Sequence, residues 1–353
     1  MDISKREQKV IYILLEHRSL QSSEIHKMLL ERKEDVSLVT VKRALASMTA
    51  QGILTASGAG RSSSYTISAL GRLYADIDAQ AYCAIEPDRR YGQRRYDQNL
   101  FAAIPATILS EEELRKLKHA TAEYIRRTTN LPPAIEKREL ERMVIELSWK
   151  SSKIEGNTYT LLDTEKLILE NKEAPGHTRD EARMILNHKD AFNFVLEHAA
   201  SFKSLSRAYI EKLHAIIIKD LNVGTGLRKR VVGITGSIYQ PLDNQHQIRE
   251  GLEELIAAAL RLKTPYEKAL IALLGISYLQ PFEDGNKRTA RLLANAILLA
   301  HACSPLSYRS VEEGEYRAAT LVFYELHSIV PFKAIFIEQY VFAAGNYAVK
   351  SGR

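Results

Sequence analysis

The chain contains 353 residues, of which 45% are hydrophobic and 26% are charged, a balance that excludes a disordered chain and suits two or three packed domains. Its two cysteines, Cys83 and Cys303, are too few and too far apart for a disulfide framework or a thiolate zinc site. No stretch has the roughly 18 to 20 apolar residues that a membrane helix needs, and the N-terminus lacks the apolar core of an export signal. We therefore expect a cytoplasmic protein without a membrane partner.

The N-terminal residues 1–75 carry +4 of the total net charge of +6. They show three short helical patterns, each with one apolar stripe. In the third pattern the stripe consists of Leu38, Val41, Leu45 and Met48. Burial of this stripe turns Thr40, Arg43 and Ser47 outward, on a polar and cationic face without carboxylates.

A basic hairpin follows these helices. Ile53 and Leu54 begin one strand, residues 57–63 form a flexible tip that carries Arg61, and residues 65–67 form the returning strand. Three helices and a basic hairpin resemble a winged helix-turn-helix. The resemblance implies that DNA binds through four residues, Thr40, Lys42, Arg43 and Arg61. The alternative is a winged helix that mediates only protein contacts or dimerisation.

Residues 76–109 are predicted to form a linker, because the stretch 86–97 is charged and rich in turn residues and favours a solvated strap. From residue 110 to residue 353 the pattern is almost wholly helical, and only residues 231–241 resemble a strand. The helices are expected at 110–128, 134–155, 162–172, 179–198, 206–220, 246–262, 266–279, 287–302, 312–326 and 332–348.

The polar loop between the helices at 266–279 and 287–302 is the most informative segment. Gly285 and Asn286 supply a turn whose amides, together with the first amides of the next helix, form an anion nest. Three cations then occupy the positive end of that helix, where each is disfavoured by up to about 1 kcal/mol. They are Lys287, Arg288 and Arg291. A phosphate-bearing ligand would relieve all three, and the alternative is pairing to neighbouring carboxylates such as Asp284 or Glu283.

The run from Pro281 to Arg291 resembles the signature of the Fic domain family, a helical fold whose active members transfer AMP from ATP to a hydroxyl group of a target protein. The resemblance implies that Asp284 holds Mg²⁺ and that Gly285 and Asn286 cradle the phosphates. It also implies that Arg288 binds the inner phosphates of ATP and Arg291 the terminal phosphate.

Two positions depart from this signature. Gln280 occupies the place of the catalytic histidine, and an amide is not basic enough to take a proton from a hydroxyl group near pH 7. Lys287 occupies the place of the second glycine, as in the related Doc toxins, which transfer phosphate instead of AMP. We therefore expect AMP transfer to be weak or absent.

A third motif lies at the end of the helix near residues 140–156. Glu155 is followed by the helix terminator Gly156, so its carboxylate faces the negative end of a helix dipole and needs a cation. The segment resembles the inhibitory motif of Fic proteins, with Ser151, Glu155 and Gly156 in the matching places. The resemblance predicts an ion pair between Glu155 and Arg291 that blocks the site of the terminal phosphate.

Residues 226–228 and 232–241 resemble the β-hairpin flap of the Fic fold, which pairs with a segment of the target protein. The flap residues would be Thr235, Gly236 and Ile238. Taken without the resemblance, this segment predicts a hairpin at the edge of a helical bundle.

The sequence thus predicts a mainly α protein, in which a Fic-fold bundle at residues 110–353 follows a winged helix at residues 1–75. The preferred function is binding of ATP and Mg²⁺, restrained by Glu155 and coupled to DNA binding. The alternative is an active adenylyltransferase or phosphotransferase that modifies an unknown target protein at the flap, and a scaffold that binds neither ligand is a third. The sequence leaves the oligomeric state open, a homodimer included.

Overall fold

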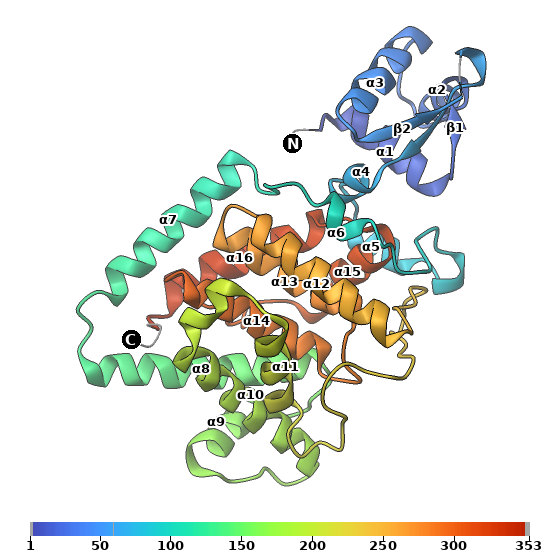
Figure 1. Ribbon diagram of the computed structural model, residues 1–353. Coiled ribbons are helices and arrows are strands. Elements are labelled where there is room, and N and C mark those ends of the chain that lie inside the picture. Colours follow the sequence, from blue (N-terminus) through green and yellow to red (C-terminus); the bar gives the residue numbers. More distant parts are fainter. Residues whose placement is uncertain (1–2, 59, 350–353) are drawn as a thin grey trace. The chain divides into compact units, whose positions relative to one another are not determined.

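The computed structural model describes residues 3–58 and 60–349, and most of these residues are helical (Figure 1). Contacts divide the chain into two compact units. Unit 1 consists of Met1–Ile108, Ile234–Gln240 and Arg317–Lys333. Unit 2 consists of Leu109–Gly233, Pro241–Tyr316 and Ala334–Arg353. Helices α15 (Glu313–Leu326) and α16 (Val330–Asn346) contribute residues to both units.

Unit 1 begins with a three-helix motif and a small sheet. Its elements are α1 (Lys5–Glu16), β1 (Leu20–Gln21), α2 (Ser22–Glu31), α3 (Leu38–Ala50), β2 (Leu54–Ser57), β3 (Ser64–Ile67), α4 (Ala69–Leu73), α5 (Ala79–Ala84) and α6 (Leu100–Ala103). The sheet is antiparallel with the order β1-β3-β2, so the predicted hairpin is present as β2 and β3. Ser37 caps α3 by accepting a hydrogen bond from the amide of Thr40.

The core of this motif contains the predicted apolar stripes. Val41, Leu45 and Met48 of α3 are almost fully buried, together with residues of α1 and α2. Val322 and Leu326 of α15 belong to the same hydrophobic cluster. Within unit 1, therefore, one hydrophobic cluster includes residues of the three-helix motif, of the segment 75–82 and of a helix far away in the sequence.

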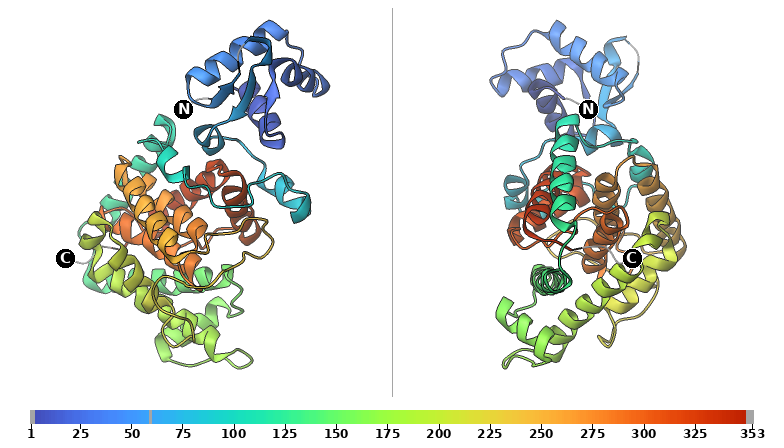
Figure 2. Two further views of the ribbon diagram at one scale, coloured as in Figure 1. Left: turned by 45° about the vertical axis from the view of Figure 1, so that its right-hand side comes forward. Right: turned by 90° about the vertical axis from the view of Figure 1, so that its left-hand side faces the viewer.

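Unit 2 is a helical bundle (Figures 1 and 2). Its elements are α7 (Glu111–Thr128), α8 (Pro133–Ile154), α9 (Leu161–Glu170), α10 (Arg179–Glu197), α11 (Arg207–Ile217), α12 (Gln245–Arg261), α13 (Pro265–Leu279) and α14 (Asn286–Ala300). Each expected helix begins and ends within three residues of the observed one. None of the helices in the described parts of the chain is both long and apolar enough to span a bilayer.

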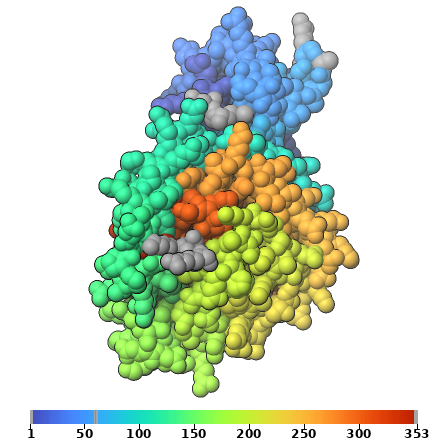
Figure 3. All heavy atoms as spheres, turned by 60° about the vertical axis from the view of Figure 1, so that its left-hand side comes forward, coloured from blue at the N-terminus to red at the C-terminus, as the bar shows by residue number. Residues whose placement is uncertain are grey.

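The centre of unit 2 is the pair α13 and α14, in contact with each other and with α8, α10, α11 and α12 around them (Figure 2). All residues of α13 from Tyr266 to Leu279 except Lys268 are buried, as expected for a helix that is apolar on every side. The end of α14 comes close to the surface, where an orange-red segment lies in a hollow (Figure 3). A cavity of about 470 Å³ at the end of α14 is lined by Ala199, Ala200, Lys203, Leu299, Ala300, His301 and Ala302. The polar loop before α14 is thus anchored between two buried helices.

Residues 231–239 form no strand, so the strand expected at 231–241 is wrong. The segment contains a turn in which the amide of Ser237 donates to the carbonyl of Ile234 at 3.1 Å. Its last residue, Gln240, pairs with Arg95 in an isolated parallel bridge. The turn and the second arm bond to other segments instead, since Gly236 accepts from Arg90, the amide of Ile238 donates to Glu325 and that of Gln240 donates to the carbonyl of Arg94.

Candidate functional site

The loop between α13 and α14 is shaped by two residues with positive φ. Gln280 ends α13 at φ 49°, and Gly285 precedes α14 at φ 77°. At Gly285 the positive φ strains any other residue, and an added Cβ would lie 3.1 Å from Cγ2 of Ile218, which is closer than an ordinary contact. Asn286 closes the loop, because its side chain accepts a hydrogen bond from the amide of Phe282 at 2.9 Å and donates one to the carbonyl of Phe282 at 2.8 Å. The N-cap residue Gly285 supplies no side-chain hydrogen bond to the first amides of α14.

Two residues that the sequence analysis did not single out hold this loop. His214 of α11 stacks on Phe282 with ring centroids 3.7 Å apart, and its Nε2 lies 2.9 Å from the carbonyl oxygen of Asp284. Arg228 is 4% exposed and donates from Nε to the carbonyl of Gln280 at 2.6 Å. No periodicity or motif marks His214, and Arg228 belongs to the run that resembles the flap, but the contacts of both residues with the loop depend on packing between distant segments.

The three cations of α14 have different surroundings. Arg288 is 2% exposed and pairs with Asp284 at 3.0 Å between Nη2 and Oδ2. Arg291 is fully buried and Lys287 is partly exposed. Neither of these two pairs with a carboxylate of the loop. The alternative kept open by the sequence, pairing within the loop, thus applies to Arg288 alone.

Glu155 supplies the carboxylate that faces the other two cations. It caps the end of α8, and its side chain lies 2.8 Å from Nη1 of Arg291 and 3.5 Å from Nζ of Lys287. Burial alone would raise the pKa of Glu155, but the charges of Arg291 and Lys287 outweigh burial and lower it below its usual value. The ion pair that the sequence predicts between Glu155 and Arg291 is therefore present, with Glu155 ionised at neutral pH.

Ser151, one turn before Glu155, binds the same guanidinium group. Arg291 donates from Nε to the hydroxyl of Ser151 at 2.9 Å and from Nη2 to its carbonyl at 2.7 Å. On the other side, the guanidinium carbon lies 5.7 Å from the centre of the Tyr316 ring. Both residues of the motif in α8 thus hold Arg291, and a phosphate that takes this guanidinium must displace the carboxylate.

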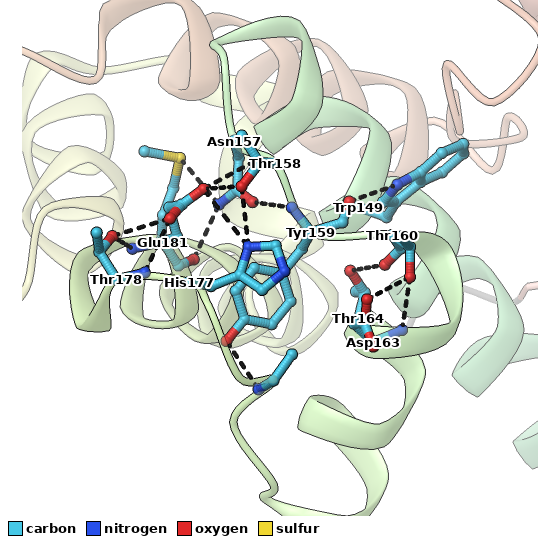
Figure 4. A network of polar contacts seen from close by, with 12 residues as sticks. Trp149, Asn157, Thr158, Tyr159, Thr160, Asp163, Thr164, His177, Thr178 and Glu181 are labelled. Atoms are coloured by element: carbon cyan, nitrogen blue, oxygen red, sulfur yellow. Dashed lines mark hydrogen bonds and ion pairs between the residues drawn. The ribbon is translucent and has the colours of Figure 1, made fainter.

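The segment after Glu155 is tied to α10 by a network of polar contacts (Figure 4). Asn157 donates to the carbonyl of Glu181 at 2.9 Å, and the amide of Thr158 donates to the carboxylate of Glu181 at 2.9 Å. Hydrogen bonds from Thr158 and Thr178 lower the pKa of Glu181 to about 2. Because Glu181 stays ionised and bonded, the turn that carries Glu155 is held in one place.

Gln280 is held by its own helix. Its side-chain amide donates to the carbonyl of Ser277 at 2.6 Å, and the residue is 8% exposed. Two histidines near the loop, His214 and His188, are buried. Burial lowers the pKa of His214 to about 4 and that of His188 well below its usual value. Neither His188 nitrogen has a hydrogen-bond partner among the described residues. The loop therefore has an amide where the family signature has a general base.

Residues 204–298, which include the loop and nearly all of α14, match the family model of the Fic/DOC family. This chain contains a Fic/DOC family domain. Residues 3–122 match the model of the Penicillinase repressor family, and the three helices and hairpin of unit 1 form the winged helix of that match.

Relatives of the Fic domain carry the name protein adenylyltransferase. The chain is 28% identical over 197 residues to the protein adenylyltransferase Fic of Nematostella vectensis, a match that covers 51% of this chain and 43% of the relative. It is 25% identical over 171 residues to the protein adenylyltransferase fic-1 of Caenorhabditis elegans, covering 47% and 34%. The matches thus span less than half the length of these curated relatives.

Solved structures show the same fold. The structure of Fic-1 from C. elegans, residues 134–508, aligns with a TM-score of 0.56 at 21% identity and covers 67% of this chain and 70% of that chain. A Fic domain signalling protein from Bacteroides thetaiotaomicron aligns with a TM-score of 0.53 at 19% identity, covering 65% and 94%.

The donor set of the Fic domain fits a Mg²⁺ ion held jointly with a nucleotide. Asp284 is one of the two acidic residues of the loop, and its side chain is 64% exposed. Among the described residues no group of three or more His, Cys, Asp or Glu could hold a metal by itself. One carboxylate together with ligand phosphates is the usual way in which Mg²⁺ is bound.

The predicted flap residues Thr235, Gly236 and Ile238 belong to unit 1, where Arg90 bonds to Gly236 and Glu325 to Ile238. Glu325 accepts a hydrogen bond from the amide of Ile238 at 3.2 Å, and Arg90 donates to the carbonyl of Gly236 at 2.8 Å. The two holding side chains pair with each other at 3.3 Å and are buried. The expectation that residues 86–97 form a solvated strap is therefore wrong for Arg90, which is 8% exposed.

The predicted DNA-binding residues lie on the winged helix. Lys42 and Arg43 are exposed on α3, and the hydroxyl of Thr40 lies 3.0 Å from that of Ser37 at the helix cap. Arg61 lies in the 3-10 turn Gly60–Ser62 between β2 and β3, and its side chain is outside the described part of the structure.

Proposed function

We propose that this protein is a DNA-binding regulator whose Fic domain binds ATP with Mg²⁺ and is restrained by Glu155. In this proposal, Gly285 and Asn286 receive the phosphates, Arg288 binds the inner phosphates and Arg291 the terminal one. Asp284 holds Mg²⁺, which supplies charge neutralisation between the phosphates. Transfer of AMP to a target protein is slow or absent.

The observation that carries the proposal is the contact between Glu155 and Arg291. Arg291 is fully buried, and its guanidinium group is shared by the carboxylate of Glu155 and both oxygens of Ser151. A buried arginine requires an anion, and an oxygen of a terminal phosphate can take the place of the Glu155 carboxylate oxygen at Nη1 of Arg291. Binding of ATP and pairing with Glu155 therefore compete for one guanidinium group.

The presence of Gln280 supports binding of ATP without efficient transfer of AMP. General-base catalysis contributes roughly two to four powers of ten to a rate. The side-chain amide of Gln280 already donates to Ser277, and no lone pair of an amide is basic enough to replace an imidazole. Neutral His214 does not replace it, because its Nε2 is bonded to the carbonyl of Asp284.

The match to the Penicillinase repressor family and the exposed cations of α3 support DNA as the partner of the winged helix. Recognition would place α3 in the major groove, where Lys42 and Arg43 contact phosphates or base edges. In this proposal, bound nucleotide changes the affinity of the winged helix for DNA. Bound DNA then changes the affinity of the Fic domain for nucleotide by the same factor.

Thermal unfolding with ATP and Mg²⁺ tests the nucleotide site. The Glu155→Gly variant should gain more thermal stability from ATP than the wild type does, because the competing carboxylate is absent. Glu197→Gly is the matched control, since Glu197 is an exposed carboxylate at the end of another helix, α10. No ATP-dependent shift in either the wild type or Glu155→Gly would contradict the proposal and favour a scaffold.

A second function, transfer of AMP or phosphate to a protein hydroxyl, is favoured by the names of the relatives. Incubation of Glu155→Gly with labelled ATP distinguishes the two. We expect no labelling of the Glu155→Gly protein, and a gain of labelling in Glu155→Gly/Gln280→His. Labelling of Glu155→Gly that disappears in Glu155→Gly/Asp284→Ala would establish the transferase instead.

Binding of a DNA duplex tests the winged helix. Salt-sensitive binding should weaken in Lys42→Ala/Arg43→Ala, because two phosphate or base contacts are lost. The matched control is Arg115→Ala/Lys116→Ala on α7, where both side chains are exposed. Unchanged binding in the α3 variant would reject this face.

A further inference from the structure

A second arginine-rich site lies in unit 1, away from the DNA-binding residues of α3. A cavity of about 480 Å³ is lined by the end of α1, by Arg72 of α4 and by residues 90–95. This volume lies in the range of about 300 to 1,000 Å³ that is typical of small-molecule sites. None of Thr40, Lys42 and Arg43 lines it.

The charges around this cavity are almost all positive. Its lining includes the arginines Arg18, Arg72, Arg90, Arg94 and Arg95. The lining contains one carboxylate, Glu16, which accepts a hydrogen bond from Arg32 outside the lining. The guanidinium group of Arg90 is already bonded within the protein, since it pairs with Glu325 and donates to three carbonyl groups.

The other four arginines have no such partners. The guanidinium groups of Arg18, Arg72, Arg94 and Arg95 form no hydrogen bond and no ion pair with any residue in the described parts of the chain. Burial lowers the pKa of Arg72, and the charge of Asp97 opposes this effect only in part. Four cations that line one concave space repel each other, and an anion between them would relieve this repulsion.

The helix dipole does not account for four cations. The C-terminal end of α1 carries a partial negative charge equivalent to about half an elementary charge, which favours one or two cations near it. Arg18 lies just beyond that end. The remaining cations come from α4 and from residues 94–95, which are not part of α1.

The wall formed by residues 91–95 is fixed in place. The ring of Tyr91 packs edge-on against the rings of Tyr82 and Tyr12, with centroids 5.2 and 6.2 Å apart. At Gly92 an added Cβ would lie 2.5 Å from the hydroxyl of Tyr82 and 2.6 Å from Cβ of Glu325. The cavity is therefore a preformed feature of unit 1 and not a gap beside a loose strap.

We infer that this cavity binds a small anion with two or more phosphate groups, held by Arg18, Arg72, Arg94 and Arg95. Arginine is the side chain that binds phosphate oxygens best, and two linked phosphates match a charge of about +4. The concave shape favours a small molecule over a DNA duplex, whose backbone needs an extended surface. The inference concerns a site separate from the Fic loop and does not depend on the proposed function.

Occupation of this site would also restrain the flap. The carbonyl of Arg94 accepts a hydrogen bond from the amide of Gln240 at 3.0 Å, and Arg95 forms the bridge with Gln240. An anion that orders the side chains of Arg94 and Arg95 therefore stabilises the backbone to which the end of the flap is bonded.

Titration with pyrophosphate, followed by calorimetry on the full chain, tests the site. Arg94→Ser/Arg95→Ser should weaken pyrophosphate binding about tenfold or more, since two charge-assisted contacts are lost. Arg115→Ser/Lys118→Ser on α7 is the charge-matched control and should bind as the wild type does. Equal weakening in both variants, or no pyrophosphate binding by the wild type, would overturn the inference.

Hydrogen exchange locates the anion and separates this site from the Fic loop. With pyrophosphate, we expect slower exchange at residues 93–95 and at Gln240. Slower exchange confined to residues 284–291 would overturn the inference. So would an Arg94→Ser/Arg95→Ser variant that loses duplex DNA binding but keeps its affinity for pyrophosphate, because the cavity would then serve DNA.

Discussion

The two arginine clusters of this protein differ in how their charges are neutralised. At the Fic loop, Arg288 and Arg291 are buried and each is paired with a carboxylate, Asp284 or Glu155. At the cavity of unit 1, Arg94 and Arg95 are exposed and have no carboxylate partner among the described residues. The arginines of the Fic loop are thus neutralised by carboxylates of the chain itself, whereas the arginines of the cavity are open to a ligand.

This difference has a physical consequence. A buried pair leaves an uncompensated charge in the protein when one partner is removed, so the loss of either partner is strongly destabilising. Exposed cations are solvated, contribute little to stability and remain free to bind. Substitution of a paired arginine at the Fic loop should therefore reduce stability strongly, whereas substitution of the unpaired arginines at the cavity should mainly reduce ligand affinity.

The largest expected effect on stability is at Arg291. Arg291→Ala leaves the carboxylate of Glu155 without its main partner and removes two hydrogen bonds to Ser151. The free energy of unfolding should fall by about 3 to 5 kcal/mol, measured by urea denaturation.

The matched control for this change is Arg126→Ala. Arg126 pairs with Glu123 on the exposed surface of α7, and such pairs contribute at most about 1 kcal/mol. Equal losses in the two variants would show that the Glu155–Arg291 pair is no more important than a surface contact.

A smaller effect is expected from pH at the Fic loop. Burial lowers the pKa of His214 to about 4, against about 6.5 in an unfolded chain. Between these values the unfolded state binds more protons, so stability falls as pH falls from 6.5 toward 4. At pH 5 the loss from this residue is about 2 kcal/mol.

Urea denaturation at pH 7 and pH 5 measures this loss. His214→Gln should reduce the difference between the two pH values, whereas His119→Gln, at an exposed position of α7, should leave it unchanged. His188 and His327 are also buried with lowered pKa values, so part of the loss remains in both variants. An unchanged difference in His214→Gln would contradict the burial of this imidazole.

Next in size is the glycine on which the Fic loop depends. Gly285→Ala places a Cβ at φ 77° and close to Ile218, which should reduce stability by about 1 to 2 kcal/mol and weaken ATP binding. Gly345→Ala is a control, because a Cβ there would meet nothing within 4 Å. Thermal unfolding with and without ATP separates the two effects, and wild-type behaviour of Gly285→Ala would reject the nest.

The smallest effect on stability is expected at the open cluster. Arg94→Ser/Arg95→Ser should change the free energy of unfolding by no more than about 0.5 kcal/mol, as is usual for exposed side chains. A loss of several kcal/mol would show that these arginines are structural, and the contrast between the two clusters would disappear.

The sequence predicted the helices of both units because each apolar stripe, and the fully apolar run in α13, has one stable arrangement. It also predicted the contact between Glu155 and Arg291, because each residue sits at the wrong end of a helix dipole and the family motif links them. Local rules and a motif were sufficient in these cases.

The sequence did not predict features that depend on contacts between distant segments. In the sequence, Arg90 is one of several charges in a stretch predicted to be solvated. In the structure it pairs with Glu325, which lies 235 residues away. The turn and the second arm of the flap bond to that pair and to Arg94. The cavity of unit 1 combines α1, α4 and the strap, and no single segment shows it.

The central claim is that Glu155 and the terminal phosphate of ATP compete for Arg291. Calorimetric titration of ATP and Mg²⁺ into the wild type, Glu155→Gly, Arg291→Ala and the double variant tests it most directly. We expect Glu155→Gly to bind ATP about tenfold more tightly than the wild type, and the same change to bring no gain when Arg291 is absent. An equal gain from Glu155→Gly in both backgrounds would contradict the claim.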